Sequence, residues 1–198
     1  MGLVVTSQPG AEPLLVADAK LYMHIDDNAW DDDIQAVVKS LRKGIEITQQ
    51  RSLITQTWTW TFDAFTDVME DDGQTIYVPR PPLQSITSIK YYDNDGAQQT
   101  WSSSKYSADV SGDFKGRIRP AYGESYPAHR TVMNSIEVIF VAGYGTAGTD
   151  CPESTILGLK MLTAIDFDRG SEINVRKVEN MKRAADALIA LDALDEAG

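Results

Sequence analysis

The stretch that decides the fold is Ser135 to Pro152, Ser-Ile-Glu-Val-Ile-Phe-Val-Ala-Gly-Tyr-Gly-Thr-Ala-Gly-Thr-Asp-Cys-Pro. Its first residues alternate between apolar and polar side chains and then become apolar on both faces, which predicts a strand that enters a core. Gly143, Gly145 and Gly148 then end the strand and leave Tyr144 between two flexible points of the backbone.

Helix signals follow this strand at once. Asp150 is the expected start of a helix, because Glu153 lies three residues later, as in a capping box. Pro152 falls in the first turn, where a missing N–H costs nothing. A β region therefore gives way here to a helical C-terminus.

The C-terminal part is expected to form two helices, over residues 150–169 and 172–193, with Gly170 between them. The second helix has an acidic end and a basic first half. The basic positions are Arg176, Lys177, Lys182 and Arg183.

Upstream, residues 53–150 follow a period of two. Trp58, Trp60 and Phe62 share one face of the first predicted strand and threonines occupy the other. The run Asp93-Asn94-Asp95-Gly96 is typical of a hairpin turn. Further short strands are expected at 75–78, 86–92, 98–101, 106–110, 116–118 and 135–142. Short strands joined by turn residues predict a small antiparallel sheet or barrel.

The N-terminal part reads as a loose arm over residues 1–12 followed by two helices. The first spans 14–25, with Leu14, Leu15, Ala17, Leu21 and Ile25 available to a core. The second spans about 31–50 and opens on three aspartates, which favour a helix N-terminus. Its apolar stripe is Ile34, Val37, Val38, Leu41 and Ile45.

This order predicts an α+β protein. The helices of residues 1–52 and 151–198 are expected to pair as a discontinuous four-helix core. Residues 53–150 are expected to form a β insertion between them.

Composition and charge exclude several classes of site and function. The chain has 198 residues, a net charge of −11 spread along its length, one cysteine and two histidines far apart. These numbers exclude an internal disulfide and a Cys/His zinc site. No apolar run is long enough for a membrane span and no signal peptide is evident, which predicts a cytosolic protein. The acidity argues against a protein that grips DNA, although not against one that surrounds it.

Motifs along most of the chain give it a family likeness. They include Leu14 to Ile25, Asp33-Ile34, Glu46 with Thr48, Arg51 to Trp58, Pro81-Pro82-Leu83, Ile86, Ile89, Tyr91-Tyr92-Asp93, Asp95-Gly96, Tyr106, Tyr126-Pro127, Phe140 to Gly145, and Pro152. Their order resembles that of the phage head–tail connector (head-completion adaptor) proteins, in the longer branch with a β insertion. That branch occurs in tailed phages, prophages and gene transfer agents. The helix beyond Gly170 departs from the match.

The resemblance implies a structural protein without a catalytic step, cofactor or metal. Such proteins assemble as a ring, usually of about twelve subunits, beneath the portal vertex. The ring extends the DNA channel, through which DNA passes without specific binding, and offers a platform to the stopper or tail-completion protein. The implied location is the head–tail junction of the virion, with host cytoplasm during assembly and no membrane contact.

Candidate contact residues are Trp30, Tyr144 and the basic positions of the last predicted helix. Trp30 lies in the acidic connection 26–33, whose aspartates are interpreted as a helix start and solvated loop rather than a cation site. Tyr144 is open to two interpretations, a contact residue or the cap of a core. The basic positions Arg176, Lys177, Lys182 and Arg183 either form a solvated helix face or meet DNA or an acidic portal rim.

Two other function classes remain as alternatives. A ligand-binding β module would stack carbohydrate on Trp58 and Trp60, although their alternation favours one apolar face of a sheet. An enzyme such as a hydrolase would use the acidic cluster 26–33. No nucleophile motif or phosphate-binding loop accompanies that cluster.

Overall fold

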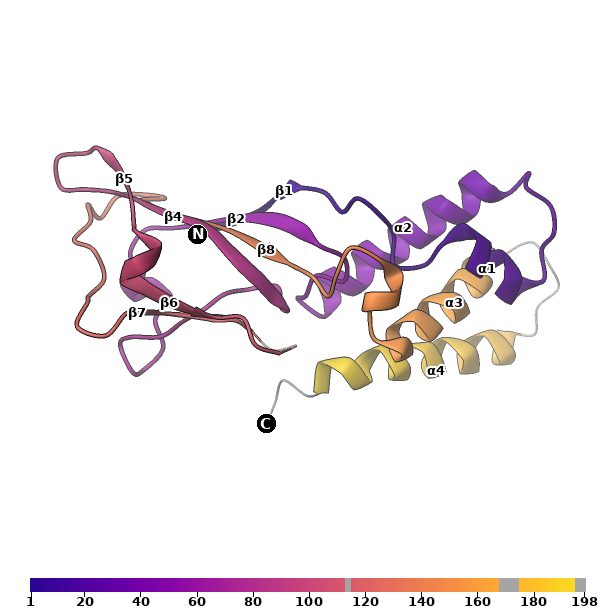
Figure 1. Cartoon of the computed structure of the whole chain (residues 1–198). Helices are drawn as coiled ribbons and strands as arrows, with labels where there is room; N and C mark the ends of the chain where they lie inside the picture. Colours follow the sequence, from indigo (N-terminus) through magenta and orange to yellow (C-terminus); the bar gives the residue numbers. More distant parts are fainter. Residues whose placement is uncertain (113–114, 168–174, 195–198) are drawn as a thin grey trace. The chain divides into compact units, whose positions relative to one another are not determined.

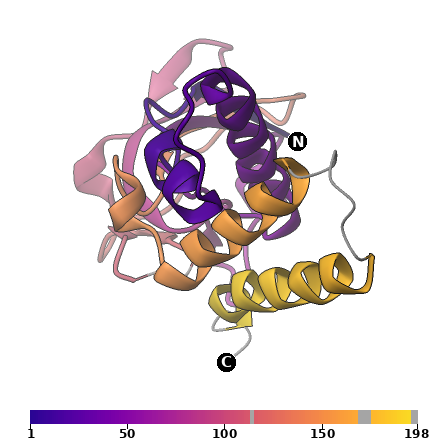
Figure 2. The same cartoon turned by 90° about the vertical axis from the view of Figure 1, so that its right-hand side faces the viewer.

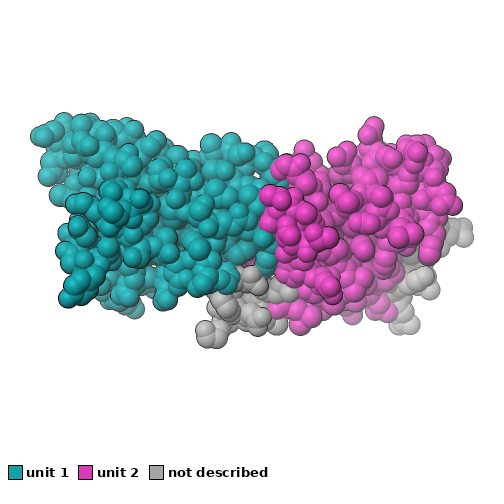
Figure 3. Space-filling model, in the orientation of Figure 1, with its two compact units in different colours: residues 1–9, 55–144 teal, residues 10–54, 145–198 magenta. Residues whose placement is uncertain are grey.

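The computed structural model describes residues 1–112, 115–167 and 175–194, with side chains of the last helix described over 178–191. The chain divides into two compact units, which Figure 3 colours teal and magenta. The β unit consists of residues 1–9 and 55–144, and the helical unit consists of residues 10–54 and 145–198.

A five-stranded antiparallel sheet forms most of the β unit (Figure 1). Its strand order is β1-β2-β8-β4-β5. The strands are β1 (Gly2–Ser7), β2 (Gln56–Phe62), β4 (Leu83–Tyr92), β5 (Gln98–Thr100) and β8 (Ile136–Ala142). The strand of the opening stretch, β8, is therefore central, with Phe140 opposite Trp58 on one side and Ile86 on the other.

A second antiparallel sheet has the order β3-β7-β6, from Ile76–Tyr77, Arg117–Pro120 and Tyr106–Asp109. Short 3-10 helices lie at Phe65–Asp67 and Ser103–Lys105. Both sheets contribute to one apolar cluster, in which Trp60, Phe140 and Ile118 are buried. The expected hairpin turn is confirmed, with Gly96 at φ 85° and its N–H donating to Asp93 O at 3.0 Å.

The loose arm expected over residues 1–12 is wrong for its first half. Gly2–Ser7 forms β1, an edge strand paired with β2 from Gly2 opposite Thr61 to Ser7 opposite Thr57. Leu3 and Val5 pack against the apolar cluster. This burial stabilises a strand that the local sequence pattern indicates only weakly. Residues 1–9 therefore belong to the β unit and not to the helical segment 1–52.

The helical unit contains α1 (Val16–Met23), α2 (Asp31–Thr48), α3 (Glu153–Phe167) and α4 (Val175–Leu194). Figure 2 looks onto this unit, where α3 runs between the N-terminal helices and α4. α3 contacts each of the other three helices. It is accordingly apolar on several faces, as a helix surrounded by others must be.

The helix expected to start at Asp150 starts three residues later. Gly148–Asp150 forms a separate 3-10 turn, and the Asp150 carboxylate accepts from Ala147 N at 2.9 Å. Asp150 therefore closes the turn before α3 instead of capping α3. Ile156 N donates to Pro152 O at 3.1 Å, which places Pro152 at the helix entrance.

The apolar stripe of α2 is confirmed, because Ile34, Val38 and Ile45 are buried. The core positions expected on α1 are only partly correct. Leu14, which precedes the helix, is buried, whereas the N-cap residue Leu15 and Leu21 of the helix are exposed.

The α+β class and the antiparallel pairing are thus confirmed, with two sheets in place of a barrel. Among the described residues, no helix is long and apolar enough to cross a membrane.

Candidate interaction surfaces

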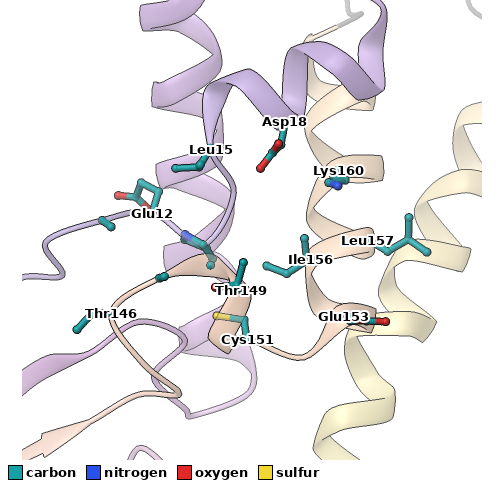
Figure 4. A pocket seen from close by; sticks show the side chains of 14 residues that line it. Glu12, Leu15, Asp18, Thr146, Thr149, Cys151, Glu153, Ile156, Leu157 and Lys160 are labelled. Atoms are coloured by element: carbon teal, nitrogen blue, oxygen red, sulfur yellow. The ribbon is translucent and has the colours of Figure 1, made fainter.

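The helical unit contains a pocket of about 640 Å³, which we call the α1–α3 groove (Figure 4). Its walls come from residues 11–18, from the loop and 3-10 turn at 146–151, and from residues 153–160 of α3. The approach between two of these segments is close, because a Cβ on Gly148 would come within 1.9 Å of Pro13 O. A glycine is therefore required where the turn meets the chain before α1.

Apolar side chains at the α1–α3 groove remain in contact with solvent. Leu15 is 59% exposed and Leu157 is 43% exposed, while Cys151 is buried. Leucines exposed at a concave site are suited to contact an apolar group of a partner.

Four charged side chains also line the α1–α3 groove: Glu12, Asp18, Glu153 and Lys160. Figure 4 shows Asp18 and Lys160 at the upper part of the pocket and Glu153 near its lower end. Asp18, Glu153 and Lys160 make no ion pair with another described residue. Two carboxylates and one ammonium are therefore available to a partner.

The fourth charge, Glu12, is held by the buried Arg42 of α2. Arg42 Nε donates to Glu12 Oε2 at 2.6 Å, and Arg42 Nη1 donates to Glu46 Oε2 at 2.7 Å. Glu46 Oε1 in turn accepts from Leu53 N at 3.0 Å. Burial by itself lowers the pKa of Arg42, but the hydrogen bond with Glu12 and the charges of Glu46 and Glu12 outweigh it and raise this pKa. This network ties the segment before α1 and the chain after α2 to one buried cation.

Cys151 lies beside the same segments. Its Sγ donates to Leu53 O at 3.3 Å. Burial, with the charges of Asp150 and Glu46, raises the pKa of the thiol to about 12. The group is therefore neutral and unreactive at neutral pH, as expected for a structural cysteine.

A second surface lies on α2, opposite its buried stripe. This outer α2 face consists of Lys39, Ser40, Lys43, Gly44 and Ile47, all of them exposed. Ile47 is 63% exposed, and the two lysines make no ion pair with another described residue. A Cβ on Gly44 would meet no atom of the described residues within 4 Å. The face thus carries one exposed apolar side chain at its C-terminal end, two lysines before it and open space above a glycine.

The predicted contact residues lie at separate places. Trp30 precedes α2, is 48% exposed and packs edge-on against Phe167 with ring centroids 5.7 Å apart. Tyr144 is half-buried at the end of the β unit. Lys182 and Arg183 are exposed on α4, whereas the side chains of Arg176 and Lys177 lie outside the described residues. Their roles as contacts stay predictions.

The tryptophan platform is not available to a carbohydrate. Trp58 is 7% exposed and Trp60 is 5% exposed, and both belong to the apolar cluster of the β unit. The Arg80 guanidinium covers the Trp58 ring at 5.0 Å. The alternation seen in the sequence therefore marks the core face of a sheet.

Aspartates of the acidic connection before α2 make a backbone hydrogen bond and an ion pair. Asp27 Oδ1 accepts from Ala29 N at 2.9 Å, and Asp31 pairs with Lys20 at 2.8 Å. Within the described ranges, no three His, Cys, Asp or Glu side chains are grouped so that they could hold a metal ion.

Sequence reasoning missed both the α1–α3 groove and the outer α2 face. The sequence predicts Leu15 in a core, because apolar residues on two faces of a short helix leave no single stripe to separate them. The outer α2 face did leave a signal. Ile47 falls off the stripe of Ile34, Val38 and Ile45, and Gly44 interrupts a helix without a visible reason.

Chains of this fold occur in solved gene transfer agent particles, among them the following three. One, from the neck of an empty gene transfer agent (GTA) particle computed with C6 symmetry, matches with a TM-score of 0.76 and 16% identity over 97% of this chain and 95% of its own. A chain from the virion of a native GTA particle gives 0.77 and 18% identity, over 96% of this chain and 94% of its own. A chain from the neck of a native GTA particle computed with C12 symmetry gives 0.65 and 18%, over 93% and 94%.

This protein has the fold of those particle chains. The likeness covers nearly the whole of each chain, including both units, and it confirms at the level of fold the resemblance seen in the sequence. No protein-family profile and no curated sequence matches the chain. The relation is therefore carried by structure, since the identities are only 16–18%.

Proposed function

We propose that this protein is a structural head–tail connector of a phage-like particle. The observation that carries the proposal is the match over 97% of this chain and 95% of a chain from a GTA particle neck. A match of this extent includes the β unit as well as the helices, so the shared feature is the whole subunit and not one common motif.

In this role, copies of the protein form a ring below the portal, extend the DNA channel and dock the stopper or tail-completion protein. We propose twelve copies, since a similar chain lies in a neck computed with C12 symmetry. The protein needs no cofactor or metal and has no catalytic step. Its place is the head–tail junction of the virion, reached from the host cytoplasm.

Charge supports passage of DNA without binding. The net charge is −11 per chain, and a ring multiplies it. Phosphates are held by Lys and Arg surfaces that release counterions, so an acidic collar does not retain the DNA that passes through it.

We further infer that the helices from the two ends of the chain form one core in each subunit, around α3. This core would be the rigid body of the ring, and the β unit would be the inserted part. Tyr144, Trp30 and the basic positions of α4 are the first candidates for contacts with neighbouring proteins.

The deciding experiment is negative-stain imaging of the purified protein, alone and with the portal protein of the same particle. Rings, or monomers that assemble only on the portal, are the expected result. Protein that stays monomeric and does not bind the portal at micromolar concentrations would contradict the proposal.

A further inference from the structure

Two solvent-exposed apolar surfaces lie on the helical unit, and each lacks a partner in the described chain. The α1–α3 groove exposes Leu15 and Leu157, and the outer α2 face exposes Ile47. Both are built from residues of one compact unit, so their relation does not depend on the β unit.

The two surfaces cannot meet within one copy. The buried stripe of α2 at Ile34, Val38 and Ile45 packs into the unit, and Ile47 lies about 200° around the helix from Ile45. The outer α2 face therefore points away from the helices that form the groove. Contact between the two surfaces requires two molecules.

Their charges are complementary. The groove offers Asp18 and Glu153 against Lys160, without ion pairs to other described residues. The outer α2 face offers Lys39 and Lys43 on the flank of Ile47. Exposed apolar side chains next to complementary charges are found at specific protein interfaces.

Gly44 gives an independent indication of a close neighbour. A glycine inside a helix costs roughly 0.5–1 kcal/mol relative to alanine. No described atom lies within 4 Å of the position that its Cβ would take, so packing among the described residues does not require it. A glycine on an open face lets the backbone of α2 approach a partner closely.

From these observations we propose that the outer α2 face of one copy docks into the α1–α3 groove of the next copy. Ile47 enters beside Leu15 and Leu157, and the lysines of α2 approach Asp18 and Glu153. The contact joins two different surfaces, so each copy keeps one of each for a further neighbour, and the series closes by rotation. The inference rests on the proposed ring and identifies the surfaces that build it.

The test uses full-length variants that leave the fold intact. Gly44→Leu adds bulk where the chain has open space and improves helix propensity, and Leu157→Glu places a carboxylate in the groove. Gln35→Leu, on an exposed position of α2 outside the outer face, is the matched control. Sedimentation velocity should show self-association or portal-dependent assembly weakened at least about tenfold by the first two changes and unaltered by the control.

A mixture of the two variants tests whether the two surfaces bind each other. Each single variant retains one intact surface, so Gly44→Leu and Leu157→Glu together should form one-to-one pairs and no rings. If either variant assembles as well as the unchanged protein, or if the mixture forms rings, the proposed surfaces are wrong.

Cross-linking gives a second readout for weak association. A chain with Ile47→Cys and Leu157→Cys should give a ladder of multimers with a short bismaleimide, and each single change should give none, because Cys151 is buried. A double variant that stays monomeric, free and on the portal, overturns the proposal. Rings that form on the portal from all variants would overturn the docking surfaces and leave the proposed function standing, whereas an unchanged protein that never meets the portal would contradict that function itself.

Discussion

Gly158 of α3 lies against Ile189 of α4, so closely that a Cβ on Gly158 would come within 2.6 Å of Ile189 Cγ1. The same Cβ would lie 3.1 Å from Ala185 O, and both Ala185 and Ile189 are buried. The two helices therefore approach each other at a position where only glycine fits. This contact attaches the C-terminal helix to α3, where the resemblance in sequence had ended.

Gly158→Val should loosen α4 by overpacking this contact. The expected loss is about 1–3 kcal/mol in the free energy of unfolding, since neither the Ala185 backbone nor the buried Ile189 can move freely. Urea denaturation followed by circular dichroism measures it. Gly44→Ala, at a helical glycine with open space, is the matched control and should stabilise the protein by about 0.5–1 kcal/mol. Equal effects at the two glycines would contradict the close contact.

Arg42→Ala should strongly destabilise the helical unit. It leaves Glu12 and the buried Glu46 without the guanidinium that binds both, and breaking a buried pair costs about 3–5 kcal/mol. Thermal unfolding should show a large drop in Tm. Arg117→Ala, which removes the exposed pair with Asp109, should change Tm little, because water and salt screen such a pair. A fall in Tm for Arg42→Ala as small as that for Arg117→Ala would show that the ion pairs of Arg42 with Glu12 and Glu46 do not hold the segment before α1 in place.

Cys151 should resist thiol reagents in the folded protein. Its pKa is raised to about 12, so the thiolate that reacts is scarce at pH 8. Reaction with a chromogenic disulfide should be slow in buffer and fast in urea. Because the folded pKa is raised, the unfolded chain loses this proton first, and the group's contribution to stability falls as pH rises from about 9 towards 12. Rapid labelling without denaturant would contradict the burial.

Tryptophan quenching should report almost entirely on Trp30. It is the exposed member of the four, whereas Trp58, Trp60 and Trp101 are buried. Iodide should quench a minor part of the emission, and Trp30→Phe should remove most of that part. Oligosaccharides should leave the emission unchanged. Strong quenching that survives Trp30→Phe would indicate that the β unit opens its core.

Local patterns predicted the elements well where one face is apolar. The alternation of Trp58, Trp60 and Phe62 and the stripe of Ile34, Val38 and Ile45 each allow one orientation towards a core. β1 was missed because Gly2–Ser7 has no alternating polar face, and its strand state depends on pairing with β2. The start of α3 was misplaced because Asp150 meets the chemical requirement for a cap but uses its carboxylate on Ala147.

The candidate surfaces were harder to predict, because they too depend on contacts between segments that are distant in the sequence. Leu15 and Leu157 are ordinary helix residues in the sequence, and their exposure follows only from how α1, α3 and the turn before α3 come together. Gly44 and Ile47 differ from their neighbours in the sequence, but a glycine has a packing reason in some helices and none in others. Only the tertiary structure shows that Gly158 is packed against a neighbouring helix and that Gly44 has open space beside it among the described residues.

The sequence by itself determined the α+β class, the order of helices, strands and helices, and the apolar faces that form both cores, because these follow from the periodicity of neighbouring residues. Tertiary structure alone decided that the N-terminus joins the sheet and that one acidic groove and one basic helix face stay open. These features depend on how segments distant in the chain pack, which leaves some apolar side chains covered and others in water. Gly44 and Ile47 differ from the local pattern of their helix, but that pattern does not decide which surfaces stay open.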